Sequence, residues 1–193
     1  MNRFIHIPKT AGTSISNAIG QQVNHMTYRQ IMSAGKHDSS FIFTCVRNPY
    51  DRAISAFLFV NNQVDNAIAN GVSVTNHYTD GAVNADDFWS NKMSDAMWRL
   101  HSKLNTYIRP QYKWTEEDDT GGVSSRINHI LRYESLEEGW SELQNLHGFP
   151  DLPVDNVTPN RDSNDWDSML SSKAKSRIAE YYADDFNYFN YNQ

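Results

Sequence analysis

The first apolar run of the chain ends in a short turn built from small and hydroxyl residues. Residues 5–14 read Ile-His-Ile-Pro-Lys-Thr-Ala-Gly-Thr-Ser, and the apolar residues of 15–19 have helical spacing. A turn between a strand and a helix directs backbone N–H groups and the positive end of the helix dipole at one point, which suits a phosphate group. Lys9 adds a mobile positive charge. The residues that would surround this phosphate are Pro8, Lys9, Thr10, Ala11, Gly12, Thr13 and Ser14.

The turn differs in register from the common nucleotide-binding loop. That loop has the pattern Gly-x-x-x-x-Gly-Lys-[Ser/Thr], in which the lysine directly precedes the hydroxyl residue. Here Lys9 lies three residues before Gly12. We therefore interpret the turn as a phosphate-binding loop with a pattern of its own.

A second segment, residues 41–55, places a positive charge where another strand ends. Its apolar and aromatic start, Phe41–Val46, predicts a buried strand, and Pro49 fits the first turn of a following helix. Arg47 lies at the end of this strand, and Ser55 follows two helical turns later. Ligands of open parallel α/β sheets bind at the carboxyl ends of the strands. Arg47 and Ser55 therefore suit a second phosphate, since arginine offers a fork of donors and serine a hydroxyl.

At these two segments the chain resembles the sulfotransferase superfamily, and within it the carbohydrate sulfotransferases of the heparan-sulfate 2-O and chondroitin type with their short bacterial relatives. The family pattern Pro-Lys-x-x-[Gly/Cys]-[Thr/Ser] matches residues 8–13, and Arg-[Asp/Asn]-Pro-x-x-Arg-x-x-Ser matches residues 47–55. The resemblance implies that the first segment holds the 5′-phosphosulfate of the donor PAPS (3′-phosphoadenosine 5′-phosphosulfate), with Lys9 acting in catalysis. It also implies that Arg47 and Ser55 hold the 3′-phosphate, and that PAP is the product left after transfer.

Shorter matches extend the resemblance over nearly the whole chain. They are Arg109-Pro110-Gln111, Arg132-Tyr133-Glu134-x-Leu136, Asn156-x-Thr158 and the tyrosine-rich residues 181–191. The resemblance implies a single domain over residues 1–193 with a P-loop-like, three-layer α/β fold. The alternation of predicted strands and helices indicates the same architecture, a central parallel sheet flanked by helices.

An acceptor hydroxyl needs a base, and histidine titrates in the required range. His25 heads the segment His-Met-Thr-Tyr-Arg-Gln-Ile, which resembles the family segment His-x-[Ser/Thr]-x-x-[Asp/Glu]-[Phe/Ile]. The resemblance implies that His25 is the catalytic base, although Gln30 stands where the family has an acid. His101 is the second candidate, because related enzymes carry a histidine in that region. We interpret His6 as a packed residue of the first strand.

The composition limits the classes of partner. The chain has 193 residues, a formal net charge of −6 and a mean hydropathy of −0.67. It shows neither the basic stripe typical of proteins that bind nucleic acid nor an apolar run long enough to span a membrane. The single cysteine, Cys45, is typical of a reducing cytoplasm, and a strand follows Met1 so closely that we expect no signal peptide or membrane anchor. No spacing of His, Cys and carboxylates indicates a metal site.

Further expectations concern the elements and one loop. Residues 61–86 are mostly polar, so we expect a long loop that contributes to acceptor binding. Ser135 and Glu138 have the spacing of a capping box. The predicted strands cover residues 3–7, 41–46 and 127–131, and the predicted helices cover residues 14–19, 27–34, 50–60, 85–103, 135–147 and 171–185.

Three functions fit the sequence. The leading interpretation is transfer of a sulfuryl group from PAPS to a hydroxyl of a carbohydrate or small-molecule acceptor. The second is a small nucleotide or metabolite kinase, which the missing Gly-Lys-Ser register and the lack of an obvious strand-end Asp for Mg²⁺ disfavour. The third is a non-catalytic module that binds PAP, another nucleotide or a partner protein.

Overall fold

In a computed structural model of the chain, two compact units are distinguished by their internal contacts. The structure describes residues 2–35, 41–71, 81–93, 106–118, 121–153 and 165–193. The first unit comprises Met1–Asn48, Pro110–Arg161 and Asp184–Asn192, and the second comprises Pro49–Arg109, Asp162–Ala183 and Gln193.

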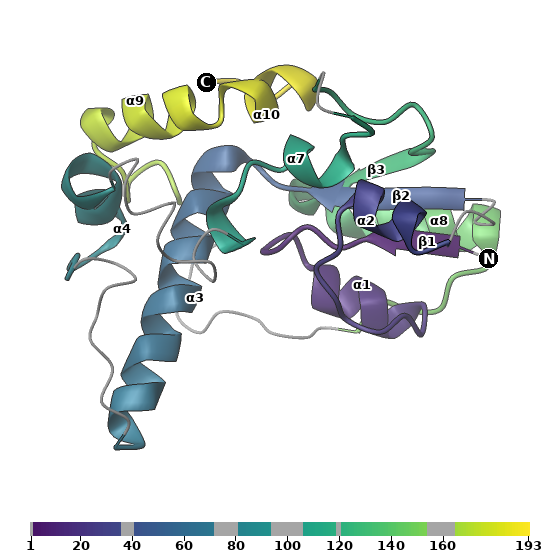
Figure 1. The fold of residues 1–193 in the computed structure, drawn as a ribbon, viewed down its shortest axis with the longest axis horizontal. Helices are drawn as coiled ribbons and strands as arrows, with labels where there is room; N and C mark the ends of the chain where they lie inside the picture. The colour runs from purple at the N-terminus through teal and green to yellow at the C-terminus, as the bar shows by residue number, and fades with distance from the viewer. Residues whose placement is uncertain (1, 36–40, 72–80, 94–105, 119–120, 154–164) are drawn as a thin grey trace. The chain divides into compact units, whose positions relative to one another are not determined.

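A three-stranded parallel sheet forms the centre of the first unit (Figure 1). Its strands are β1 (Asn2–Ile5), β2 (Phe41–Val46) and β3 (His129–Arg132), in the order β1-β2-β3. Strands with near-continuous apolar sequence, such as β2, are typical of parallel sheets, because both faces of such sheets are covered. The predicted central parallel sheet is therefore confirmed.

The register of the sheet brings the strand ends to one edge. Ile5, the last residue of β1, pairs with Thr44, and Val46, the last residue of β2, pairs with Arg132. The Thr44 hydroxyl also donates to the Ile5 carbonyl oxygen at 2.9 Å, which ties the first two strands together. Arg47 directly follows β2 and therefore lies at the edge from which the chain leaves β1.

Helices cover both faces of this sheet. One face carries α1 (Gly12–Ala18) and α8 (Leu136–His147), and the other carries α2 (Tyr28–Ser33) and α7 (Tyr112–Thr115). Phe189, which follows α10 (Ala183–Tyr188), packs on the second face as well. The unit thus has the three layers, helix on sheet on helix, that the sequence predicted.

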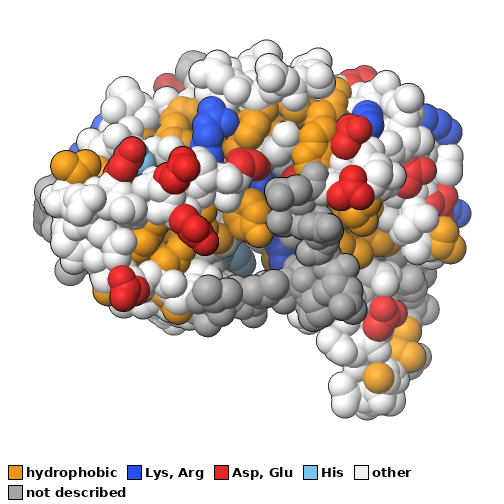
Figure 2. All heavy atoms as spheres, turned by 180° about the vertical axis from the view of Figure 1, so that it is seen from behind, with side chains coloured by type: hydrophobic (Ala, Val, Ile, Leu, Met, Phe, Trp, Pro, Cys, Tyr) orange, Lys and Arg blue, Asp and Glu red, His pale blue; other side chains and the backbone are white. Residues whose placement is uncertain are grey.

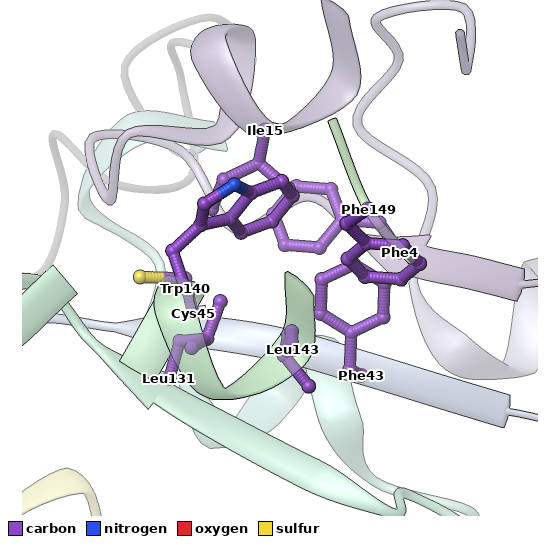
Figure 3. Packing of buried hydrophobic residues seen from close by; sticks show 8 residues of the cluster. All are labelled: Phe4, Ile15, Phe43, Cys45, Leu131, Trp140, Leu143 and Phe149. Atoms are coloured by element: carbon purple, nitrogen blue, oxygen red, sulfur yellow. The ribbon is translucent and has the colours of Figure 1, made fainter. Parts of the chain in front are cut away.

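The apolar core on the first face is rich in aromatic rings. Figure 3 shows the rings of Phe4, Phe43 and Phe149 gathered together, with Trp140 and Leu143 of α8 beside them. Full burial of a side chain of this size stabilises the fold by about 1.5–3 kcal/mol. Close approach of α8 depends on Gly139, since a Cβ there would lie 2.7 Å from a methyl group of Leu131. This packing holds the sheet, and with it the edge that carries Arg47.

The described residues of the second unit are mainly helical. They form α3 (Pro49–Ala69), α4 (Ala85–Asp87), the π-helical turn η1 (Phe88–Lys92) and α9 (Ser172–Tyr181). Among the described residues, no helix combines the length and the apolar character needed to cross a membrane. Cys45, in the first unit, is fully buried, and burial raises the pKa of its thiol, so it is a core residue and not a reactive one.

The loop predicted for residues 61–86 is wrong over its first part, because α3 continues to Ala69. Side chains four residues apart support this extension. The Asn61 side chain donates to Asp65 at 3.0 Å, and the Asn70 side chain donates to the Asn66 carbonyl oxygen at 2.7 Å. Residues 72–80 of the predicted loop lie outside the described residues.

Two other local predictions are wrong. Ser135 makes no side-chain cap, because the chain enters α8 through a 3₁₀ turn, Tyr133–Ser135, that leaves Ser135 at φ −129° and ψ 38° instead of in the extended conformation of a cap. The last predicted helix is divided at Tyr182, whose hydroxyl donates to the Ile108 carbonyl oxygen at 2.6 Å. Residues 94–103 of the helix predicted for 85–103 lie outside the described residues.

Candidate functional site

The turn between β1 and α1 has a strained backbone. Lys9 and Ala11 both adopt left-handed conformations, with φ of 70° and 62°. Thr10 between them is fully buried, and its hydroxyl closes the turn by donating to the Ile7 carbonyl oxygen at 2.8 Å. A left-handed conformation costs a non-glycine residue about 1–2 kcal/mol, and such strain is concentrated at binding sites. Left-handed residues within a turn also direct neighbouring N–H groups to one side, as in anion-binding nests.

The seven residues predicted for the phosphate loop lie in this turn and in the first three residues of α1, all within the first unit. Pro8, Thr10, Gly12 and Ser14 are buried, whereas Lys9, Ala11 and Thr13 are half-buried. The backbone around Lys9 is therefore fixed by buried neighbours, while its side chain keeps access to solvent. Such a lysine is suited to contact an anion that enters from solution.

Gly12, the first residue of α1, lies directly against the His6 imidazole. A Cβ on Gly12 would overlap the atoms Cδ2 and Nε2 of that ring. We expect Gly12→Ala to lower the free energy of unfolding by about 1–3 kcal/mol, because either the ring or the turn must move. Thermal unfolding of the purified variant measures this loss. A melting temperature equal to that of the wild type would contradict the close packing of His6 on the turn.

His25 lies beside the same turn. Its ring contacts the ring of His6 edge-on, with 4.5 Å between centroids, and it forms a hydrogen bond with the His6 backbone. Burial lowers the pKa of His25, and the charge of Lys9 lowers it further. Burial, together with His25 and Lys9, lowers the pKa of His6 to about 3. Both rings are therefore neutral at pH 7, which is the state in which a histidine accepts a proton.

The segment that carries His25 is fixed by a capping box at the start of α2. The Thr27 hydroxyl accepts a hydrogen bond from the Gln30 N–H at 3.3 Å, and the Gln30 side-chain oxygen accepts one from the Thr27 N–H at 2.8 Å. Gln30 thus fills the capping position that an acid also fills, so its presence does not disturb the placement of His25.

Arg47 is buried at the end of β2, where it contacts Lys9, Tyr133 and Gln111. Its guanidinium donates to the Lys9 carbonyl oxygen at 3.2 Å and lies 3.8 Å from the centre of the Tyr133 ring. The side-chain amide of Gln111 accepts from the Arg47 N–H at 2.9 Å and donates to the Arg47 carbonyl oxygen at 2.8 Å. Arg47 therefore joins the end of β2 to the turn that follows β1.

Gln111 is held in turn by Asp185 of α10. The two carboxyl oxygens of Asp185 accept from the N–H groups of Gln111 and Tyr112, at 2.8 and 2.9 Å. Gln111 and Asp185 are both fully buried. The role of these two residues was not predicted, and the signal for it in the sequence is the match of Arg109-Pro110-Gln111 to a family segment.

A family model for the sulfotransferase family matches residues 3–192. The chain belongs to the sulfotransferase family. This family transfers sulfuryl groups, so the turn at Lys9 and the strand end at Arg47 lie in a transferase. Comparisons with curated proteins and with solved structures give no match.

Two further residues of this sulfotransferase belong to the second unit. Ser55 lies on α3 and is buried, and its role beside Arg47 stays a prediction. Arg52, also on α3, is fully buried and donates to the carbonyl oxygens of Tyr107 and Arg109 at 3.0 and 2.9 Å. Arg52 thus holds the backbone of this segment in place from a buried position. His101, the second candidate base, lies outside the described residues.

The described surface carries no concentrated positive charge in the view of Figure 2. Acidic side chains are scattered over this face, and the Lys and Arg side chains are spread singly among them. Among the described residues there is also no group of three or more His, Cys, Asp or Glu side chains placed to bind a metal ion.

Proposed function

We propose that this sulfotransferase uses PAPS as its donor and transfers the sulfuryl group to a hydroxyl of a carbohydrate or small-molecule acceptor. The observation that carries the proposal is the hydrogen bond of 3.2 Å between the Arg47 guanidinium and the Lys9 carbonyl oxygen. It joins the two motifs that the family resemblance assigns to the two phosphate ends of PAPS. A donor with phosphates at both its 5′ and 3′ positions needs two such cationic places in one site.

The residues present fit this donor. Lys9, with the backbone N–H groups of residues 10–14, would hold the 5′-phosphosulfate, and the fork of Arg47 with the hydroxyl of Ser55 would hold the 3′-phosphate. The left-handed backbone at Lys9 and Ala11 supports an anion site in the turn. PAPS, when bound, supplies an activated sulfuryl group attached to a phosphate leaving group.

The chain itself contributes charge stabilisation and a base. Lys9 stabilises the negative charge that develops on the leaving phosphate oxygen. His25, neutral because burial and Lys9 lower its pKa, takes the proton of the acceptor hydroxyl. A bond forms between the acceptor oxygen and sulfur while the bond from sulfur to the phosphate oxygen breaks, and the in-line arrangement of these groups lowers the barrier.

We further propose that the two units act as one sulfotransferase domain over residues 1–193. The family match supports this, since it runs through both units from residue 3 to residue 192. The carbohydrate acceptor is proposed from the resemblance of the His25 segment to the heparan-sulfate 2-O branch.

Calorimetric titration with PAP, ADP and ATP tests the donor. We expect PAP to bind at least about tenfold more tightly than ADP, because a charged hydrogen bond to the 3′-phosphate contributes about 1.5–3 kcal/mol. Arg47→Ala should lose this preference. Arg132→Ala is a matched control, because Arg132 makes the same two kinds of contact. Its guanidinium lies over the Tyr191 ring and donates to the Phe189 carbonyl oxygen.

Two results would contradict the proposal. If ADP or ATP binds as tightly as PAP to the wild type, the donor is not a 3′-phosphorylated nucleotide, and a kinase becomes the better interpretation. If Arg132→Ala loses the preference for PAP as fully as Arg47→Ala does, the loss reflects general damage to the first unit. Tight PAP binding without turnover on any hydroxyl compound would indicate a non-catalytic module.

A further inference from the structure

We infer that Gln111, held by Asp185, is the positioning residue for Arg47 and thereby for recognition of the 3′-phosphate. Tyr133 contacts the guanidinium of Arg47, and Glu134 accepts from the N–H of the next residue, Asn48, at 2.5 Å. Gln111 instead holds the peptide groups of Arg47 itself, at both the N–H and the carbonyl oxygen. The inference rests on the proposed function, because it concerns the same donor site.

The two bonds of Gln111 define where the Arg47 side chain begins. Arg47 lies one residue beyond β2, so the sheet pairing that ends at Val46 does not fix it. The Gln111 amide substitutes for a neighbouring strand at this position, since it offers one acceptor and one donor as a peptide group does. An arginine fork recognises a phosphate only in a defined geometry, and a displacement of about 1 Å in such a site can cost up to about 10²-fold.

Asp185 makes the position of Gln111 rigid. A buried carboxyl group is costly unless its oxygens are hydrogen-bonded, and here each oxygen accepts one backbone N–H at the start of α7. A continuous chain of hydrogen bonds therefore runs from Asp185 through Gln111 and Arg47 to the carbonyl oxygen of Lys9. Through this chain the C-terminal helix α10 fixes both cationic residues of the proposed donor site.

The same pair of hydrogen bonds, from a glutamine side chain to the backbone of one residue, occurs elsewhere in the first unit and supplies a matched control. The side-chain amide of Gln21 accepts from the Phe4 N–H at 3.0 Å and donates to the Phe4 carbonyl oxygen at 2.8 Å. Gln21 thus holds one residue of β1 as Gln111 holds Arg47, but Phe4 has no charged group to offer a ligand. Replacing either glutamine with methionine removes the same two bonds and keeps the length of the side chain.

The test compares Gln111→Met with Gln21→Met by calorimetry with PAP and ADP and by thermal unfolding. We expect Gln111→Met to weaken PAP binding about tenfold, with a much smaller effect on ADP, which lacks the 3′-phosphate. Gln21→Met should lower the melting temperature, by less than Gln111→Met because Gln21 is only half-buried, and should leave the ratio of the two affinities unchanged. A positioning role thus changes the ratio of affinities, whereas a merely structural role changes stability alone.

The outcomes separate this inference from the proposed function. If the wild type prefers PAP and Gln111→Met keeps the preference within about twofold, the inference is wrong and the proposed function stands. If the wild type shows no preference for PAP, the proposed function and this inference both fail. Should Gln111→Met not fold, Asp185→Asn is measured in the same way. It places an amide donor against a backbone N–H and is expected to lower the same ratio, and an unchanged ratio in that variant also overturns the inference.

Discussion

Lys9→Gly should abolish most turnover without weakening the fold. We expect kcat to fall by about 10²–10³-fold, since the variant removes the positive charge proposed to stabilise the leaving phosphate oxygen. The backbone conformation of Lys9, with φ of 70°, is one that glycine adopts without strain. The free energy of unfolding should therefore stay the same or rise by up to about 1 kcal/mol. The carbonyl oxygen of residue 9, which accepts from Arg47, is kept.

Glycine distinguishes a loss of turnover from a loss of stability better than alanine does, because alanine at this position would retain the strain of the left-handed conformation. Asn190→Gly is a matched control, since Asn190 also has a left-handed φ, 51°, in the first unit. We expect it to change stability in the same direction and to keep turnover. Steady-state rates with PAPS and urea unfolding of the two variants measure both effects. Wild-type turnover in Lys9→Gly would remove Lys9 from the mechanism.

The strand and the turn that carry the candidate site residues were predictable, because the sequence signals for them are local. The aromatic and β-branched run Phe41–Val46 predicts β2 with its observed bounds, whereas β1 ends at Ile5, two residues before the end predicted from Pro8. The mixture of lysine, glycine and hydroxyl residues over 9–14 indicates an anion-binding turn without any knowledge of the rest of the chain. Such signals depend on residues a few positions apart, and the sequence displays those directly.

The hydrogen bonds that hold Arg47 in place were not predictable, because they join residues far apart in the sequence. Arg47 and Gln111 are 64 residues apart, and Gln111 and Asp185 are 74 apart, so no periodicity or spacing connects them. A glutamine and an aspartate at those positions resemble ordinary polar surface residues, yet both are fully buried. Their bonds form only after the sheet and the C-terminal helix have packed, which is a property of the fold and not of any short segment.

We expect His25 to act as the base of the reaction with a pKa below the ordinary histidine value of 6.5. The pKa is lowered because burial disfavours the charged imidazolium and because Lys9 repels it. The base must be unprotonated, so kcat/KM should rise as the pH rises through this lowered pKa, with the midpoint of the rise below pH 6.5. His25→Asn should reduce kcat by about 10²–10⁴-fold and remove the acidic limb of the profile.

The pH profile of His25→Asn, with His147→Gln as a control on an exposed helix end, decides between candidates. If the acidic limb persists in His25→Asn, another group is the base, and His101 is then the next residue to replace.

If the limb disappears, the electrostatic effect of Lys9 on His25 can be checked by NMR titration of the His25 imidazole. In Lys9→Gly the pKa of His25 should rise toward 6.5, because one of the two causes that lower it has been removed. An unchanged pKa would contradict the proximity of His25 to the charge of Lys9, and with it the single site that the proposed mechanism requires.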